Sequence, residues 1–457
     1  MGNGKLGWKV EGAKAQYNVR LAQLSAEEEE AVLGICALFG ERAQKKEIEG
    51  EKQAMECIGE ICASYCEANS IELDAQQQKY LPKAAFLHTY GNCFLDEMLA
   101  DCKLEEIACI GLGKPLFVYC RGEGWKRTNC KFEDAHTFVA SVNKLARQSG
   151  KRVSMQTPRI NVALRDGSRM HAAVPPVCDY ALTIRKFAAQ PLCAHELAAC
   201  KTASFESLAF LWTAMQAEIS MLVAGNTASG KTTTLNALFS FVPRSERIII
   251  VEDTAEINLP HAHALRMLSS EEAGIEMGGI IRDTLRMRPD RLIVGEMRSP
   301  KEVEAFMETV LSGQGKGSYG TFHAQSCPDA LNRLRMLGAM PSDMPSIGIV
   351  VVQRRMENYD MRARKGEQVR KVVEISEISL DKAGMPQCVQ IFAMQNKALL
   401  RTKNPSVSLG KIAECFGCSQ QALEKELGKR ERLLREMGKR RISFGDAFEK
   451  VQKFMLQ

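Results

Sequence analysis

The sequence predicts an α/β protein in which a mostly parallel sheet follows a smaller α+β domain. Between about residues 191 and 396, short apolar runs that suit buried strands alternate with helical segments, an order typical of a parallel sheet covered by helices. Upstream, the sequence RINVALRDGSRMHAAV contains two alternating runs joined by Asp166-Gly167, which is a strong hairpin signal. We therefore expect a hairpin-containing domain followed by a parallel sheet.

The composition is that of a globular protein. The chain has 457 residues, of which 45% are hydrophobic, and its formal net charge is +6. This charge is small for the length, so composition alone indicates neither a nucleic-acid nor a membrane partner. No apolar stretch approaches the ~20 residues of a membrane-spanning helix, so we expect a cytoplasmic location.

Five segments follow from the patterns along the chain. Residues from about 25 to 68 have helical spacing, and Pro175-Pro176 indicate a hinge between two domains. The tail from about residue 400 is helical and highly charged. The predicted segments are a helical amino-terminal extension (1–79), an α+β domain (80–175), an interdomain linker (176–190), an α/β domain (191–399) and a helical carboxyl-terminal tail (400–457).

Within the α/β domain, we expect strands and helices to alternate. The strands come from the runs SMLVAG, RIIIV, RLIVG and GSYGTF, each preceded or followed by a helical segment. The later runs IGIVVVQRR and KVVEISEISL alternate less cleanly, and we expect them to form an added antiparallel edge of the sheet.

Residues 225–232 match the pattern G-x-x-x-x-G-K-[ST], between an apolar strand and a helix. The two glycines allow successive N–H groups to turn inward, and the positive end of the helix dipole points to the same place. We expect Lys231 to reach the β- and γ-phosphates of ATP and the Thr232 hydroxyl to hold Mg²⁺. The predicted nucleotide-binding residues are Gly225, Asn226, Thr227, Ala228, Ser229, Gly230, Lys231, Thr232 and Thr233.

Charged residues follow three other predicted strands. Glu252, Asp253 and Glu256 follow the first, Glu296 the second and His323 the third. Because the carboxyl ends of parallel strands gather around a ligand, we expect these side chains near the phosphate loop, with the strand before Glu296 adjacent to the phosphate-loop strand. The alternative is that they cap helices or lie in loops as ordinary charges.

On these motifs the sequence resembles the type II/type IV secretion and pilus-assembly ATPase superfamily, particularly its archaeal branch. GNTASGKTT resembles the phosphate loop, VEDTAEI the acidic box, and the run from RPDRLIVGE to GTFHAQS a second strand motif and a histidine box. The resemblance implies a RecA-like ATPase domain after a PAS-like α+β domain, and a homohexamer at the inner face of the cytoplasmic membrane.

The resemblance also implies a motor that hydrolyses ATP to assemble a type IV pilus-like filament or to drive a related secretion system. The implied partners are a polytopic membrane platform protein and pilin-like or secreted subunits, which are moved indirectly; nucleic acid is not expected. Two other functions stay open. One is a conjugation or DNA-transport ATPase of the same superfamily, and the other is an adaptor that binds ATP without hydrolysing it.

Several side chains receive roles from the resemblance. Because no aspartate follows the second strand, Mg²⁺ would rely on Thr232, phosphate oxygens and water, and Glu296 would bind the ion through water or polarise the attacking water. Glu256 competes for this last role, and the sequence leaves the choice open. His323 would contact the γ-phosphate region.

Two arginines precede the α/β domain. Arg169 lies in the predicted hairpin and Arg185 in the segment TIRKF, on either side of the predicted hinge. The resemblance implies that they help to close the nucleotide site, for which the planar guanidinium is suited. The alternative is a surface or interdomain salt bridge.

The cysteines and the tail suggest no further chemistry. Sixteen cysteines are scattered along the chain, and the single unit Cys415-x-x-Cys418 lacks the second unit that a four-ligand zinc site usually needs. The tail has the size of a helix-turn-helix, but it lacks a clearly basic recognition helix. We therefore expect helical packing there and no zinc.

Overall fold

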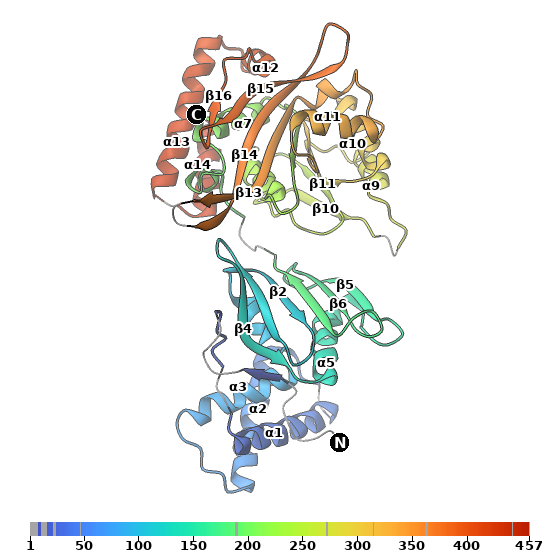
Figure 1. The fold of residues 1–457 in the computed structure, drawn as a ribbon, viewed down its shortest axis with the longest axis vertical. Coiled ribbons are helices and arrows are strands. Elements are labelled where there is room, and N and C mark those ends of the chain that lie inside the picture. Colours follow the sequence, from blue (N-terminus) through green and yellow to red (C-terminus); the bar gives the residue numbers. More distant parts are fainter. Residues whose placement is uncertain are drawn as a thin grey trace. The chain divides into compact units, whose positions relative to one another are not determined.

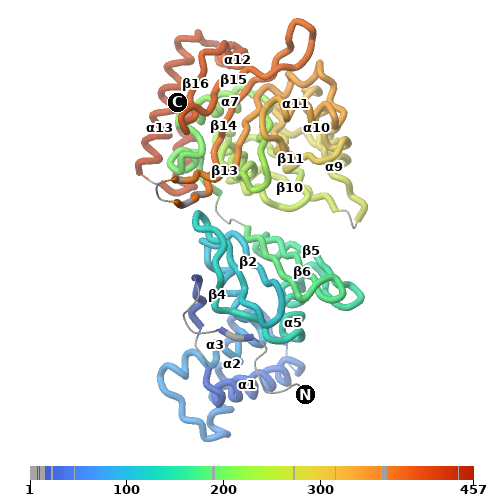
Figure 2. Tube along the Cα trace, in the orientation of Figure 1, coloured from blue at the N-terminus to red at the C-terminus, as the bar shows by residue number. Residues whose placement is uncertain are grey.

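The computed structural model describes residues 8–10, 16–21, 24–45, 47–187, 191–270, 273–313, 315–361, 364–440 and 442–456. The chain divides into two compact units, residues 1–188 and 189–457. Figures 1 and 2 show the elements of each unit. Over these ranges, no helix has the length and apolar character that crossing a membrane requires.

The amino-terminal unit contains an antiparallel sheet with the strand order β1-β4-β3-β2-β7-β6-β5. Its strands are β1 (Trp8–Val10), β2 (Leu104–Ile110), β3 (Pro115–Cys120), β4 (Gly124–Phe132), β5 (Arg159–Ala163), β6 (Arg169–Ala173) and β7 (Ala181–Arg185). Its helices are α1 (Ala26–Lys45), α2 (Gly50–Ala68), α3 (Gln77–Thr89), α4 (Leu95–Ala100), α5 (Ala135–Ala146) and the 3-10 turn η1 (Arg147–Ser149).

Two apolar cores hold this unit together. Helices α1, α2 and α3 pack around a cluster that includes the buried side chains of Val32 and Leu81. The sheet and helix α5 share a second cluster, where Phe132 and Phe138 meet edge to face. Helix α5 begins where the Asp134 side chain accepts the N–H of Thr137, as expected of an N-cap.

The predicted hairpin is present between β5 and β6, which pair in antiparallel register. At the turn, Gly167 has φ +84°, and the Ser168 N–H donates to Oδ1 of Asp166 at 3.0 Å. An Asp-Gly pair suits this turn because glycine adopts positive φ without steric cost. The hairpin is therefore set by local turn chemistry.

The prediction of a hinge at Pro175-Pro176 is corrected by the sheet. These prolines lie in the connection between β6 and β7, which are hydrogen-bonded to each other in one unit. The boundary between the units falls after residue 188, and residues 188–190 of the predicted linker lie outside the described residues. Within the described part of the predicted linker 176–190, β7 pairs with β2 and β6 as a strand of the amino-terminal sheet.

The carboxyl-terminal unit is built on a sheet with the order β10-β9-β11-β12-β8-β13-β14-β15-β16. Its strands are β8 (Met221–Gly225), β9 (Ile248–Glu252), β10 (Ala264–Leu268), β11 (Arg291–Met297), β12 (Ser318–Phe322), β13 (Ile349–Asp360), β14 (Lys365–Leu380), β15 (Pro386–Gln395) and β16 (Ala398–Arg401). Its helices are α6 (Ala194–Ala199), α7 (Phe205–Gln216), α8 (Lys231–Leu238), η2 (Phe239–Phe241), α9 (Met277–Thr284), α10 (Pro300–Ser312), α11 (Cys327–Met336), η3 (Met344–Ile347), α12 (Val407–Cys415), α13 (Gln420–Arg440) and α14 (Phe444–Met455).

Helices cover both faces of this sheet. On β8, Met221 and Val223 enter a core shared with α7, α8 and the tail helices α12 to α14, whereas Leu222 and Ala224 enter a core shared with α9, α10 and α11. Figure 1 shows α13 on one side of the sheet and α10 and α11 on the other. Because both faces are buried, the central strands are continuous apolar runs.

The order of the strands differs from the prediction. The run that contains β13 was expected at an antiparallel edge, but β13 pairs in parallel with β8, so the phosphate-loop strand lies between β12 and β13. Strand β14 pairs antiparallel with β13, as predicted, and β15 and β16 extend this antiparallel part of the sheet beyond the runs that the prediction named. Between β9 and helix α9, the chain also forms strand β10, which the sequence pattern did not indicate. The tail helices belong to the core of this unit.

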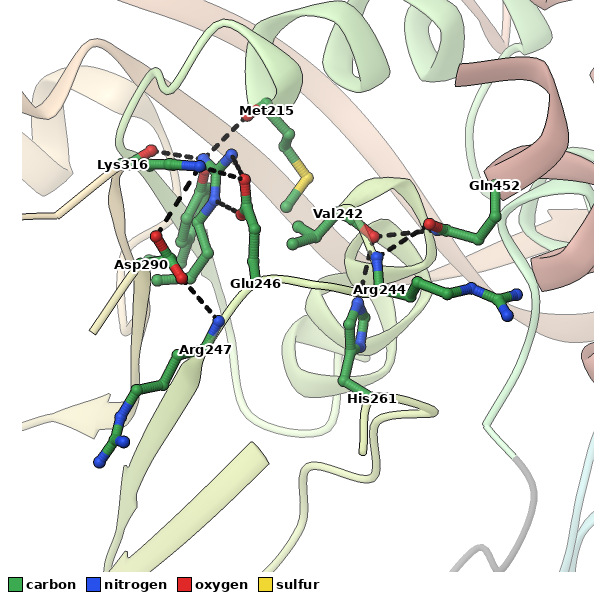
Figure 3. Close-up of polar contacts among 11 residues, drawn as sticks. Met215, Val242, Arg244, Glu246, Arg247, His261, Asp290, Lys316 and Gln452 are labelled. Carbon is green, nitrogen blue, oxygen red and sulfur yellow. Dashed lines mark hydrogen bonds and ion pairs between the residues drawn. The ribbon is translucent and has the colours of Figure 1, made fainter. Parts of the chain in front are cut away.

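A buried ion pair anchors the edge of the sheet where β9, β11 and β12 begin. The Arg291 side chain is 1% exposed, and its Nε donates to Oε2 of Glu246 at 2.6 Å. Its Nη1 donates to the Met215 carbonyl at 2.9 Å and to the Tyr319 hydroxyl at 2.8 Å. Glu246 also accepts from Lys316, whose Nζ lies 3.2 Å from its Oε1 (Figure 3).

We expect Arg291→Met to lower the free energy of unfolding by about 3–5 kcal/mol, because it leaves the buried Glu246 carboxylate with only the partly exposed Lys316 as an ion-pair partner. The control is Arg244→Met, which removes an ion pair to Glu449 whose side chains are 52% and 51% exposed. That change should cost about 1 kcal/mol or less. Urea denaturation of the purified variants measures both values, and equal losses would contradict the prediction.

Candidate functional site

The loop between β8 and α8 has the conformation of an anion cradle. Ala228 and Gly230 have φ +58° and +94°, which turns the backbone N–H groups of the loop inward. A Cβ at Gly225 would lie 2.1 Å from the Gln353 carbonyl oxygen, so only glycine fits beside β13. The Nζ of the buried Lys231 donates to the carbonyls of Gly225 at 3.3 Å and Asn226 at 3.4 Å. These residues fit a bound phosphate group.

Strands β13 and β14 brace this loop from one side. The Asn226 amide accepts the Arg355 N–H at 3.0 Å and donates to its carbonyl at 3.3 Å, and Thr234 Oγ1 donates to Oε1 of the buried Gln353 at 2.7 Å. Arg370 Nε donates to the Ala228 carbonyl at 3.1 Å. The sequence prediction missed these contacts, although Gln353 comes directly after the apolar run of β13.

The acidic segment after β9 lies against the start of α8. The Thr232 hydroxyl donates to Oε2 of Glu256 at 3.0 Å. This segment is shaped by Glu252, whose Oε1 accepts the backbone N–H groups of Glu256 at 2.9 Å and Ile257 at 3.0 Å. Burial raises the pKa of Glu252 to about 7, against the opposing effect of these hydrogen bonds and of Arg266. A hydroxyl and a carboxylate oxygen therefore meet at the predicted Mg²⁺ position, and both are ligands that this ion prefers.

The position of Glu296 corrects one prediction. Its strand, β11, is not adjacent to β8, because β12 lies between them. Glu296 nevertheless lies beside the loop, near the end of β11, where the register of β11 against β12 shifts between Val294 and Met297. Its Oε1 lies 3.6 Å from Lys231 Nζ and 2.7 Å from His323 Nε2. The preceding residue is small for a local reason, because a Cβ at Gly295 would lie 3.0 Å from the Glu252 side chain.

Arg298 is a neighbour of Glu296 that the sequence prediction did not name. Its Nε donates to Oε2 of Glu296 at 2.8 Å, and its Nη1 donates to Oδ2 of Asp253 at 2.9 Å. The guanidinium thus links the acidic segment after β9 to the end of β11. It lies three residues past the apolar run of β11, beyond the strand-end positions that the prediction considered.

The charges around Glu296 shift the pKa of each neighbour. Burial alone would raise the pKa of Glu296, but the hydrogen bond from Arg298 and the charges of His323 and Lys231 lower it overall. Burial lowers the pKa of Lys231, and the nearby carboxylates only partly oppose this. The pKa of His323 is lowered by burial and then by the charge of Lys231. Glu296 is therefore ionised at neutral pH, beside a histidine that is mainly neutral.

Arg169 and Arg185 lie opposite each other in the amino-terminal sheet. Arg169 begins β6 and Arg185 ends β7, and they form a directly paired position between these strands. Both belong to the amino-terminal unit, whereas the phosphate loop belongs to the carboxyl-terminal unit. Their part in the nucleotide site remains a prediction.

Among the described residues, no group of three or more His, Cys, Asp or Glu side chains is placed to hold a metal ion. Cys415 is exposed and Cys418 is half-buried, and both are free thiols. At the start of α8, the structure brings the Thr232 hydroxyl and a Glu256 carboxylate oxygen together.

The model of the family described as "Type II/IV secretion system protein" matches residues 142–453. The chain belongs to the type II/IV secretion system protein family. The match includes the phosphate loop, the acidic segment after β9, Glu296 and His323. The resemblance of these motifs to this family is therefore confirmed, together with the α/β fold that it implied.

Curated relatives of this family member include two uncharacterized proteins of Methanocaldococcus jannaschii. One is 34% identical over 232 residues, which cover 48% of the chain and 32% of that protein. The other is 30% identical over 367 residues, covering 76% of the chain and 64% of that protein. A Mycobacterium tuberculosis protein named for conjugal transfer is 32% identical over 235 residues, covering 48% of the chain and 65% of that protein. The chain thus spans from about a third to about two thirds of the length of these relatives.

Proposed function

We propose that this chain is a Mg²⁺-dependent ATPase, the motor of a type IV pilus-like filament or of a related secretion system. The observation that carries the proposal is the meeting of Lys231, Glu296 and His323 beside a complete phosphate loop. Nucleotide binding alone does not require an ionised carboxylate beside the lysine ammonium group, whereas hydrolysis needs a group that can polarise water. Membership of the secretion family supports the motor role.

The position of each side chain indicates its role in the proposed reaction. Lys231, which is bonded to loop carbonyls here, would turn to the β- and γ-phosphates. The ionised Glu296 would orient and polarise the attacking water, and the neutral His323 would sense the γ-phosphate through its bond to Glu296. Thr232 and Glu256 would hold Mg²⁺, which when bound would neutralise developing phosphate charge.

The test is steady-state phosphate release by the purified protein with Mg²⁺ and ATP. Turnover that stops when Mg²⁺ is chelated is the expected result. Tight ATP binding without phosphate release would favour the alternative of a nucleotide-gated adaptor.

A second candidate is a conjugation or DNA-transport ATPase, which the name of the M. tuberculosis relative favours. Single-stranded DNA separates the two functions. A pilus or secretion motor should hydrolyse ATP at the same rate with and without DNA, whereas a DNA-transport motor should be stimulated by it.

We further propose that the active form is a homohexamer in the cytoplasm, attached to the inner face of the membrane through a polytopic platform protein. The substrates moved would be pilin-like or secreted subunits. Family membership supports this assignment. Light scattering of the purified protein with and without ATP measures the subunit number, and a stable monomer under both conditions would contradict it.

Arg169→Ala and Arg185→Ala should each lower ATP turnover by about 10-fold or more, while the melting temperature stays near that of the wild type. The reason is that a motor needs a contact that exists only while the γ-phosphate is present, and a guanidinium can supply it. Arg159→Ala is the control, because Arg159 is an exposed residue at the start of β5 in the same sheet. Wild-type turnover in both variants would leave the two arginines as structural residues of the sheet.

A further inference from the structure

The candidate catalytic residues all lie on one side of the phosphate-loop strand. Glu256 and His323 follow β9 and β12, and Glu296 lies near the end of β11. These three strands lie on the β12 side of β8. The γ-phosphate must face these residues if they act on it. The nucleoside end of the same molecule must then leave the loop away from them, and on the other side of β8 lies β13.

Two arginines lie on the β13 side of the phosphate-loop strand. Arg355 of β13 and Arg370 of β14 form a directly opposed pair in the antiparallel register. They share a face of the hairpin with Gln353, because Gln353 lies two residues before Arg355 and pairs with Val372, two residues after Arg370. The Gln353 side chain bonds Thr234 of α8, so this face is the one that carries the phosphate loop.

Arg370 touches the loop itself. Its Nε donates to the Ala228 carbonyl at 3.1 Å, and its Cδ would lie 3.8 Å from a Cβ at Gly230. The Arg355 backbone is held at the same place by the Asn226 amide, and its side chain is exposed. Both arginines therefore belong to the β13–β14 hairpin, which is hydrogen-bonded to the phosphate loop at Asn226 and Ala228.

We propose that Arg370, assisted by Arg355, binds the α-phosphate and the adjoining nucleoside of ATP. This inference rests on the proposed ATPase function. A guanidinium keeps its charge at all physiological pH values, and its planar fork binds phosphate oxygens in pairs or stacks on a base.

The test compares two ligands by isothermal titration calorimetry of the full chain. ATP occupies the whole site, whereas inorganic pyrophosphate fills only the part that the loop and Lys231 surround. Arg370→Ala should weaken ATP binding by about 10-fold, and pyrophosphate binding by less than about twofold. Arg354→Ala is the matched control, because Arg354 is exposed on the opposite face of the hairpin and should leave both affinities unchanged.

Equal losses of affinity for ATP and pyrophosphate in Arg370→Ala would mean that Arg370 only holds the loop in place, which would overturn the proposal. Unchanged ATP affinity would also overturn it. If the melting temperature of Arg370→Ala is well below that of the wild type, Arg355→Ala becomes the test variant. The Arg355 side chain is exposed, so its removal should not affect folding. That variant should weaken ATP binding by about threefold and spare pyrophosphate. A wild type that binds neither ligand would instead overturn the proposed ATPase function.

Discussion

Lys231→Ala should lower ATP turnover by about 10³-fold and weaken ATP binding, without a loss of folding. The lysine Nζ is buried, within 3.6 Å of Glu296 Oε1 and of two loop carbonyls. Its ammonium group is therefore the positive charge that lies against the phosphate loop, where the phosphates of ATP are expected to bind. Its removal also withdraws one of the charges that keep the pKa of Glu296 low.

Phosphate release and calorimetric ATP titration measure the two effects of Lys231→Ala, and thermal unfolding checks the fold. Lys301→Ala is a suitable control, because Lys301 is 66% exposed and pairs with Glu276 on the surface. It should behave as the wild type. A folded Lys231→Ala variant with normal turnover would remove this lysine from the site.

Glu296→Gln should lower turnover by about 10²-fold or more while ATP binding is kept. The amide keeps the size of the side chain, but it cannot take a proton from water or carry the charge that now faces Lys231 and His323. Glu256→Gln should act differently, because Glu256 accepts the hydroxyl proton of Thr232 at 3.0 Å. We expect it to raise the Mg²⁺ concentration needed for half-maximal turnover.

The measurement is phosphate release as a function of Mg²⁺ for both variants, together with ATP binding. Asp253→Asn is a useful comparison, because Asp253 bonds Arg298 in the same cluster and is not assigned to water or to the metal. If Glu256→Gln loses the chemical step and Glu296→Gln loses the Mg²⁺ dependence, the two roles are exchanged.

Features that depend only on neighbouring residues could be predicted from the sequence. The phosphate loop, the strand before it and the helix after it are contiguous, so the pattern of residues 225–232 was sufficient to place them. The Asp166-Gly167 turn is equally local, because its φ and its hydrogen bonds involve residues within a few positions. The charged side chains predicted at the strand ends lie near the phosphate loop, since parallel strands bring their carboxyl ends to one edge of the sheet.

Which strands are neighbours could not be predicted from the sequence, because it depends on the tertiary fold. Hydrogen bonds between strands join residues far apart in the chain, such as Gln353 and Gly225, and apolar runs buried on both faces do not reveal their partners. For this reason β13 was predicted at an edge and Glu296 on a strand next to β8, whereas β13 lies beside the phosphate loop and β12 separates β11 from β8. The contact of Arg370 with Ala228, 142 residues away, has the same origin: it exists because the sheet order puts β13 and β14 against the loop.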